Sequence, residues 1–251
     1  MKTRRRLARP IRSARAIVAR RRSTGSDLIL ATILAAIAGA ANAGGFFALG
    51  QYTSHMTGYL SYLADNIAIL NLWIAAISAM AIAAFIAGAG FSALLIHWAR
   101  SHGGRQQYAW PLVIQGAALG CFSMGGLLGG EVGRVFSLAC LCFIMGMQNA
   151  TITKISGARI RTTHATGMVT DIGIEMGRAV FGRLRPGCGV AADRAKLRIL
   201  LQLVGAFLLG GIFGAIGYGL TGFLFSIPLA AVLLALGLPG VIDNSARRRR
   251  S

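Results

Sequence analysis

The sequence predicts an all-α, polytopic membrane protein built from two related halves. The chain is 55% hydrophobic and only 13% charged over 251 residues, which is far too apolar for an ordinary soluble domain. Six apolar stretches are long enough to cross the hydrocarbon core of a bilayer, and a pair of short motifs occurs twice along the chain. We place the six transmembrane helices at 28–49, 72–98, 109–129, 132–151, 199–220 and 222–239.

The repeated motif closes an apolar run with Gly-x-x-Asn-Ala and continues soon after with His-x-Thr-Gly. The first copy reads Gly39-Ala40-Ala41-Asn42-Ala43 and then Ser54-His55-Met56-Thr57-Gly58. The second copy reads Gly146-Met147-Gln148-Asn149-Ala150 and then Thr163-His164-Ala165-Thr166-Gly167. A third match relates Phe85, Gly88 and Phe91 to Phe207, Gly210 and Phe213. Such self-similarity predicts two homologous repeats, 28–129 and 132–239, in a membrane domain that covers 28–240.

These motifs resemble those of the YoaK family of bacterial inner-membrane proteins. Members of that family carry an acidic residue or Asn at the end of the first helix, a Thr-Gly motif after it, and Gly-x-Gln-Asn-Ala in the second half. The resemblance covers roughly residues 28–240. Asn42 stands where Asp is expected, and Tyr59 stands where Asn more often follows Thr-Gly. The resemblance implies a fold and a bacterial inner membrane, but no particular activity.

Basic residues set the expected orientation of the chain. Residues 1–27 carry ten basic residues against one acid, which predicts a basic arm on the anionic cytoplasmic leaflet, and 241–251 form a basic cytoplasmic tail. With six spans and the N-terminus inside, every Lys and Arg except Arg134 falls on the cytoplasmic side. This flanking pattern explains the net charge of +19 better than nucleic-acid binding does.

Two shorter apolar segments, 57–70 and 166–182, begin at the Thr-Gly motifs. The first contains Asp65, and the second contains several charged residues that would each cost about 2.5–3.5 kcal/mol at a helix centre. We interpret both as re-entrant or interfacial half-helices. Each repeat then crosses the membrane three times, so the two repeats have opposite orientations. Such an inverted repeat is typical of transporters and some channels.

The two Asn residues of the motif lie near the ends of apolar runs, where an unpaired amide would cost several kcal/mol. We expect Asn42 and Asn149 to bond to the adjacent half-helices, in which Thr57 and Thr166 stand where a helix N-cap is wanted. Two interpretations stay open. The motif either only fixes a broken helix, or it also borders a solute path at the half-helix N-termini, which can hold an anion.

Other polar residues also leave alternatives open. An imidazole can gain or lose a proton near neutral pH, so His55 and His164 could relay protons, or they could bond to headgroups and loops at the interface. Asp171, Glu175 and Arg178 share a helix face and form an ion pair, a cation site or a solvated loop. The candidate residues for a substrate or ion path are Asn42, His55, Thr57, Gly58, Gln148, Asn149, His164, Thr166, Gly167 and Asp171.

The sequence contains no Ser-His-Asp pattern, no His-Glu-x-x-His motif and no phosphate loop. We therefore expect no enzyme, cofactor or metal site. Our leading interpretation is a transporter or channel for a small solute or proton in the bacterial cytoplasmic membrane. The alternative is a non-transporting scaffold that binds lipid or a partner, in which the motifs only support the fold. Small-residue faces such as Gly116-x-x-x-Gly120 leave room for a homodimer.

Overall fold

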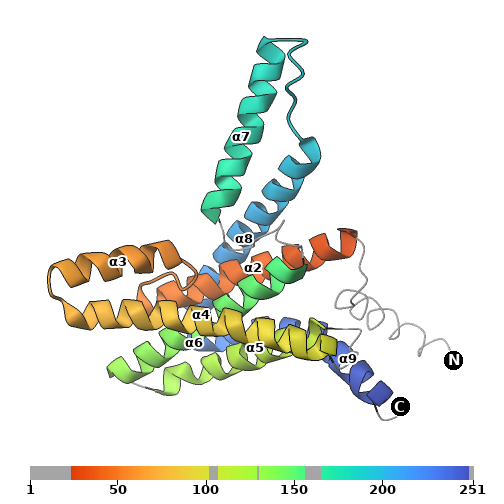
Figure 1. Cartoon of the computed structure of the whole chain (residues 1–251). Helices are drawn as coiled ribbons and strands as arrows, with labels where there is room; N and C mark the ends of the chain where they lie inside the picture. The colour runs from red at the N-terminus through yellow and green to blue at the C-terminus, as the bar shows by residue number, and fades with distance from the viewer. Residues whose placement is uncertain (1–23, 102–106, 129, 156–164, 249–251) are drawn as a thin grey trace.

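The fold is all-helical throughout the part of the chain that the structure, a computed structural model, describes: residues 24–101, 107–128, 130–155 and 165–248. This confirms the predicted all-α class, while residues 1–23 of the basic arm lie outside the described ranges. The helices are α2 (Thr24–Leu49), α3 (Met56–Ala68), α4 (Leu72–Ser101), α5 (Ala109–Phe122), η1 (Ser123–Leu127), α6 (Gly130–Ile155), α7 (Ala165–Leu184), α8 (Arg194–Thr221), η2 (Gly222–Phe225) and α9 (Ser226–Arg248) (Figure 1).

Four segments of the described chain are long and apolar enough to cross a membrane: Asp27–Phe47, Leu72–Ser101, Gly130–Lys154 and Arg194–Ile242. The last of them contains both α8 and α9, which η2 separates. Helix α5 is apolar but has only 14 residues, fewer than the about 20 that a span needs. The chain is therefore a helical membrane protein.

The predicted segments coincide with helices, with differences at their ends. The predicted half-helices 57–70 and 166–182 are α3 and α7. The span predicted at 109–129 is α5 followed by the 3-10 helix η1, and the last predicted span begins as η2. Helix α9 continues past Pro239 to Arg248, so most of the predicted tail extends this helix.

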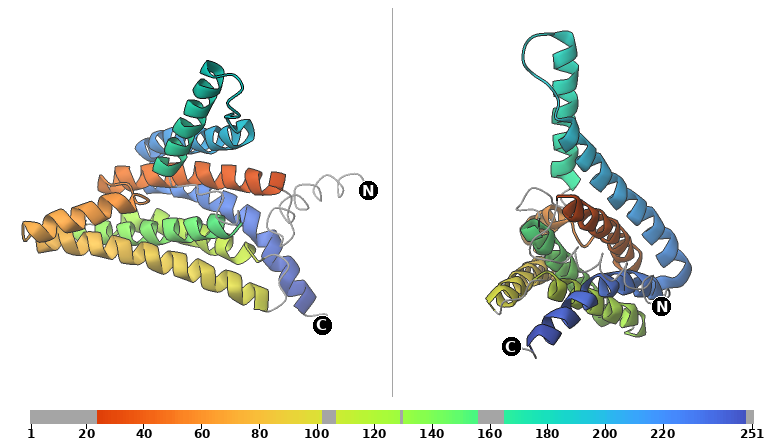
Figure 2. Two further views of the ribbon diagram at one scale, coloured as in Figure 1. Left: turned by 45° about the horizontal axis from the view of Figure 1, so that its top comes forward. Right: turned by 90° about the vertical axis from the view of Figure 1, so that its right-hand side faces the viewer.

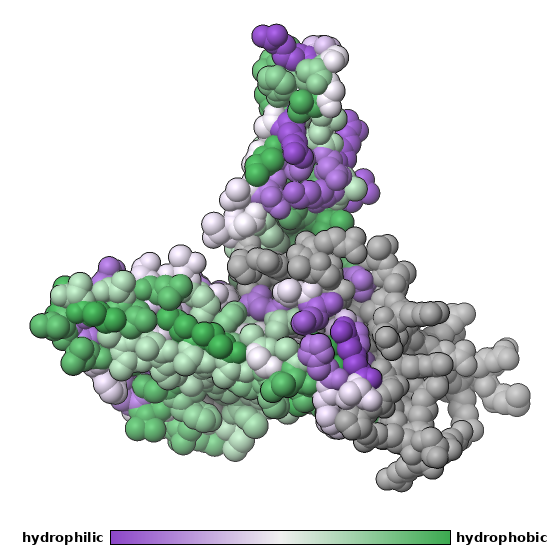
Figure 3. All heavy atoms as spheres, in the orientation of Figure 1, coloured by the Kyte–Doolittle hydropathy of each residue, from purple (hydrophilic) through white to green (hydrophobic). Residues whose placement is uncertain are grey.

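The bundle is held by three helix pairs, α2 with α8, α4 with α6, and α5 with α9 (Figures 1 and 2). Helix α2 is largely buried, whereas α4 exposes most of its surface. Figure 3 shows that apolar side chains dominate the visible face over α3 and α4. Apolar residues on the outside agree with lipid as the surrounding solvent.

Glycines allow the paired backbones to touch. A Cβ atom at Gly39 of α2 would overlap the carbonyl oxygen of Phe207 in α8, and one at Gly210 of α8 would overlap the carbonyl oxygen of Ala36 in α2. Hydrophobic exclusion from water does not draw helices together inside a bilayer, so close packing of this kind is a main source of their association.

The crossing of α4 and α6 involves positions that match those of the α2 and α8 crossing in the repeated sequence motifs. A Cβ atom at Gly146 would overlap the carbonyl oxygen of Phe85, and one at Gly88 would overlap the carbonyl oxygen of Phe143. Gly146 corresponds to Gly39 in the repeated motif. Phe85 and Gly88 likewise correspond to Phe207 and Gly210. The first glycine of Gly-x-x-Asn-Ala thus has a packing function in both copies.

The third pair, α5 with α9, is reciprocal within itself. A Cβ atom at Gly116 of α5 would lie 3.1 Å from the carbonyl oxygen of Ala230, and one at Gly237 of α9 would lie 2.9 Å from the carbonyl oxygen of Ala109. In each helix the glycine stands seven residues after the alanine that its partner contacts. Small residues therefore set the spacing of all three pairs.

We predict that Gly88→Ala lowers the free energy of unfolding by about 1–3 kcal/mol, because the added methyl group must push α4 away from the backbone of α6. Thermal unfolding in detergent measures the loss. Gly90→Ala is the matched control on the same helix, where nothing lies within 4 Å of the added methyl group. Equal melting temperatures for the two variants would contradict this account of the crossing.

Candidate functional site

Four wholly buried polar side chains gather where α6 meets helices of the first repeat. We call Ser92 of α4, Gln115 of α5, and Gln148 and Thr151 of α6 the central polar cluster. A polar group inside a membrane bundle is costly unless it is paired, so each of these side chains is expected to form hydrogen bonds.

Thr151 is the hub of the cluster. Its hydroxyl donates to the carbonyl oxygen of Met147 at 2.8 Å and lies 2.9 Å from the Ser92 hydroxyl. The amide Nε2 of Gln115 donates to the same Thr151 oxygen at 3.2 Å. Because a hydroxyl has one proton, the bond to Met147 requires Ser92 to donate to Thr151. The hydroxyl of Thr151 is then saturated, with one bond donated and two accepted.

Gln148 connects the cluster to α2, because its Nε2 donates to the carbonyl oxygen of Leu34. The other end of each glutamine has no partner. The Oε1 atoms of Gln115 and Gln148 are buried and accept no hydrogen bond within the described residues. An unpaired buried acceptor costs about 1–3 kcal/mol, so the cluster has an unmet need for hydrogen-bond donors.

Asn42 of the first motif fixes the connection between α2 and α3. It is 9% exposed, and its Oδ1 accepts from both the backbone N of Ser54 at 3.1 Å and the hydroxyl of Ser54 at 3.2 Å. The sequence predicts a bond from Asn42 to the adjacent half-helix; the bond is instead to Ser54, in the connection just before α3. This arrangement fits a structural role for the motif.

The predicted N-cap role of Thr57 is wrong. Helix α3 begins at Met56, so His55 occupies the N-cap position, and its side chain makes no capping bond. Both His55 and Thr57 are exposed. Gly58 lies beneath the imidazole, since a Cβ atom there would come within 2.7 Å of His55 Cδ2. The glycine therefore makes room for the ring of His55.

Tyr59, which stands where Asn more often follows Thr-Gly in the YoaK family, has a packing role. It is buried beside Leu138 and Cys142 of α6 and Ala81 of α4, so it attaches α3 to the bundle. Burial raises the pKa of the Tyr59 phenol, which therefore stays neutral.

The second copy of the motif is arranged differently. Asn149 is half-buried, and His164 lies outside the described residues. Helix α7 begins at Ala165, so Thr166 lies within its first turn, where its carbonyl oxygen accepts from the Thr170 hydroxyl at 2.9 Å. Thr166 is not at the N-cap position that the sequence predicts. Gly167 is exposed and has nothing described within 4 Å of a Cβ position.

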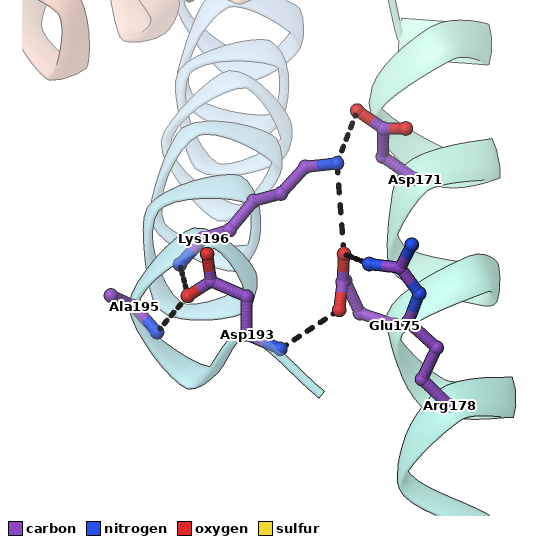
Figure 4. A network of polar contacts seen from close by, with 6 residues as sticks. All are labelled: Asp171, Glu175, Arg178, Asp193, Ala195 and Lys196. Atoms are coloured by element: carbon purple, nitrogen blue, oxygen red, sulfur yellow. Dashed lines mark hydrogen bonds and ion pairs between the residues drawn. The ribbon is translucent and has the colours of Figure 1, made fainter. Parts of the chain in front are cut away.

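Asp171 and Glu175 belong to a charge network between α7 and α8 (Figure 4). Glu175 is completely buried, and its carboxylate contacts Arg178 Nη1 at 3.1 Å, Lys196 Nζ at 3.7 Å and the backbone N of Asp193 at 2.9 Å. Lys196 also pairs with Asp171 at 3.4 Å. Of the alternatives open from the sequence, the structure contains the ion pair, and the network fixes α7 to the start of α8.

Sequence reasoning identified Gln148 but missed its companions Gln115, Thr151 and Ser92. These three residues could have been found in the sequence, because each places an amide or hydroxyl inside an apolar run. Such a polar group indicates a helix face that contacts protein and not lipid. The structure gathers these side chains and places Asn42 with Ser54, while Asp171 takes part in a different network. Within the described residues, no group of three or more His, Cys, Asp or Glu could hold a metal ion.

The packed apolar helices and their buried polar cluster define an integral membrane protein. Comparison with protein families gives a match to the family described as protein of unknown function (DUF1275), which covers residues 30–238. The chain belongs to this family, of which YoaK is a member. No curated protein and no solved structure matches the chain.

We predict that Asn42→Ala lowers the free energy of unfolding by about 1–3 kcal/mol, because the backbone N of Ser54 loses its acceptor. Hydrogen exchange of residues 50–56 should accelerate. Asn71→Ala removes a weaker and exposed contact, 3.4 Å from the backbone N of Ile74, and serves as the control. Unchanged exchange in the Asn42 variant would show that its amide does not fix this connection.

A second prediction concerns Glu175. Glu175→Gln should open the α7 connection and accelerate hydrogen exchange over residues 185–196, because it leaves Arg178 and Lys196 without their buried carboxylate. Glu131→Gln is a matched control, since Glu131 also pairs with an arginine three residues later but is exposed. We expect that control to change stability by less than about 1 kcal/mol. Similar exchange in both variants would contradict the clamping role of Glu175.

Proposed function

We propose that this chain is a transporter or channel for a small solute, formed by six membrane spans in two inverted repeats. The observation that carries the proposal is the reciprocal use of glycines. The contact of Gly39 with Phe207 has its counterpart in the contact of Gly146 with Phe85. An inverted repeat predicts this exchange, in which the first span of each half packs against the second span of the other.

The distribution of charge supports an orientation with both termini in the cytoplasm. Arg134, which the six-span arrangement places outside, pairs with Glu131 at the start of α6, whereas the other Lys and Arg residues fall in segments assigned to the cytoplasm. On this basis we propose the bacterial cytoplasmic membrane as the location. The proposal also includes the absence of enzymatic activity.

The central polar cluster is the proposed part of the solute path. It lies where α6 of the second repeat meets α2, α4 and α5 of the first, and transporters bind their solutes at such repeat interfaces. The unpaired oxygens of Gln115 and Gln148 would accept hydrogen bonds from a passing solute or water. This proposed path differs from the one that the sequence predicts. It does not include the two Thr-Gly motifs, because Thr57 and Thr166 are exposed at the starts of their helices.

A second candidate is a non-transporting membrane scaffold. The observation that favours it is the hydrogen bonding of Asn42, whose oxygen is committed to Ser54. In this case Asn42→Ala would lower stability and alter no flux. The proposal also includes a homodimer and a proton-relay role for His55 and His164. Proton entry into vesicles tests the relay role.

Swelling of proteoliposomes tests the transporter proposal. Vesicles that contain the protein are placed in iso-osmotic glycerol, urea or potassium chloride, and pyranine inside the vesicles reports proton entry. We expect faster swelling than in empty vesicles, and a loss of about tenfold in Gln148→Leu, as a hydrogen bond worth about 1.4 kcal/mol implies. Gln202→Leu, at an exposed glutamine of α8, is the control.

The outcomes separate the two candidates. Swelling that depends on Gln148 but not on Gln202 supports a path through the central polar cluster. Folded protein that accelerates no probe and moves no protons favours the scaffold.

A further inference from the structure

Helix α7 has one charged face and one apolar face, and the charged face is turned toward α8. Met168 and Glu175 are the buried residues of this helix, and Asp171 pairs with Lys196 of α8. The Glu175 carboxylate also bonds to the backbone N of Asp193, at the entrance to α8. These contacts fix the rotation of α7 about its own axis (Figure 4).

The opposite face of α7 is apolar, exposed and without charge. Val169, Met176, Val180 and Leu184 recur at helical spacing and are 57%, 57%, 53% and 73% exposed. The same face includes Gly173 and Gly177, which have nothing within 4 Å of a Cβ position, and the exposed Ile174 and Phe181 border it. We call Val169, Met176, Val180, Phe181 and Leu184 the outer face of α7.

An apolar surface of this extent is unusual for a helix surrounded by water. The bilayer is the nearest apolar phase, because the chain enters α7 from the candidate span Gly130–Lys154 and leaves it for the candidate span Arg194–Ile242. Figures 1 and 2 show that α7 stands out from the bundle, and the residues of its outer face are exposed. In Figure 3 apolar and polar side chains lie next to one another on this projection.

Charge specifies which part of the bilayer suits this helix. Arg183 in the last turn of α7 and Arg185 just after it are exposed and form no ion pair with the residues that the structure describes. Exposed arginines beside an apolar helix face are complementary to anionic phosphate headgroups. The charged groups on the other face of α7 make a position deep in the hydrocarbon core unfavourable.

We propose that α7 is an interfacial helix whose outer face binds an anionic lipid leaflet. The outer face enters the boundary between headgroups and acyl chains, and Arg183 and Arg185 contact lipid phosphates. The ion pairs of Glu175 hold α7 in the rotation that this contact requires. This lipid-binding surface does not depend on whether the protein transports a solute.

Depth-dependent fluorescence quenching tests the proposal in the full-length chain. The three native tryptophans, Trp73, Trp98 and Trp110, are replaced by Phe, and Val180→Trp places a single reporter on the outer face. The protein is reconstituted into vesicles of phosphatidylcholine and phosphatidylglycerol that contain lipids brominated at either the 6,7 or the 11,12 positions. Ala191→Trp in the exposed loop before α8 is the control reporter.

We expect the Val180→Trp reporter to lose emission with both brominated lipids, and more with the shallow 6,7 label, while the Ala191→Trp reporter loses less. Omission of phosphatidylglycerol should reduce the quenching, and so should replacement of Arg183 and Arg185 by Gln. Thermal unfolding confirms that each variant is folded.

Three results would overturn the proposal. Strongest quenching by the deep 11,12 label would make α7 a re-entrant helix. Quenching that ignores both lipid charge and the two arginines would remove the phosphate contact. Unquenched reporter together with disulfide formation between two copies of Gly173→Cys would assign the outer face to a second copy of this chain.

Discussion

The contact of one helix backbone with another at a glycine is the constraint on which the rest of this structure depends. In lipid, apolar side chains gain little by leaving their solvent, so helices associate through close packing and hydrogen bonds. Gly39, Gly88, Gly146 and Gly210 bring two helix pairs to the smallest separation that backbones allow. The bond between Ser92 and Thr151 depends on one of these crossings, because Gly88 and Gly146 let the backbones of α4 and α6 touch.

The two halves share their crossings but differ in polarity. Where the second motif carries Gln148, the first carries Ala41, and so the wholly buried amide of Gln148 has no counterpart at that position of the first motif. Asn42 is bonded to Ser54, whereas Gln148 reaches across to the carbonyl oxygen of Leu34. The two copies of the motif therefore have different polar arrangements: Asn42 holds the connection before α3, whereas Gln148 has an acceptor that no described residue uses.

The helices and their approximate bounds could be predicted from the sequence, because lipid permits few backbone structures and selects for length and hydropathy. A partner for Asn42 close to it in the sequence could also be predicted, because Ser54 lies in the short connection that follows α2. The cluster around Thr151 could not, because Ser92 and Gln115 lie on other helices whose register depends on packing. The N-cap prediction for Thr57 was wrong by two residues, because His55 occupies the N-cap position, and propensity alone does not determine where a helix begins.

The pairing of α2 with α8 also affects the order in which the protein can form. Helix α2 is the most enclosed of the candidate spans, yet its main partner begins at Arg194. At about 5–20 residues per second, the ribosome delivers α8 on the order of ten seconds after α2. During that interval Gly39 has no α8 backbone to contact. The native contact of Gly39 with Phe207 can form only after most of the chain has been synthesised.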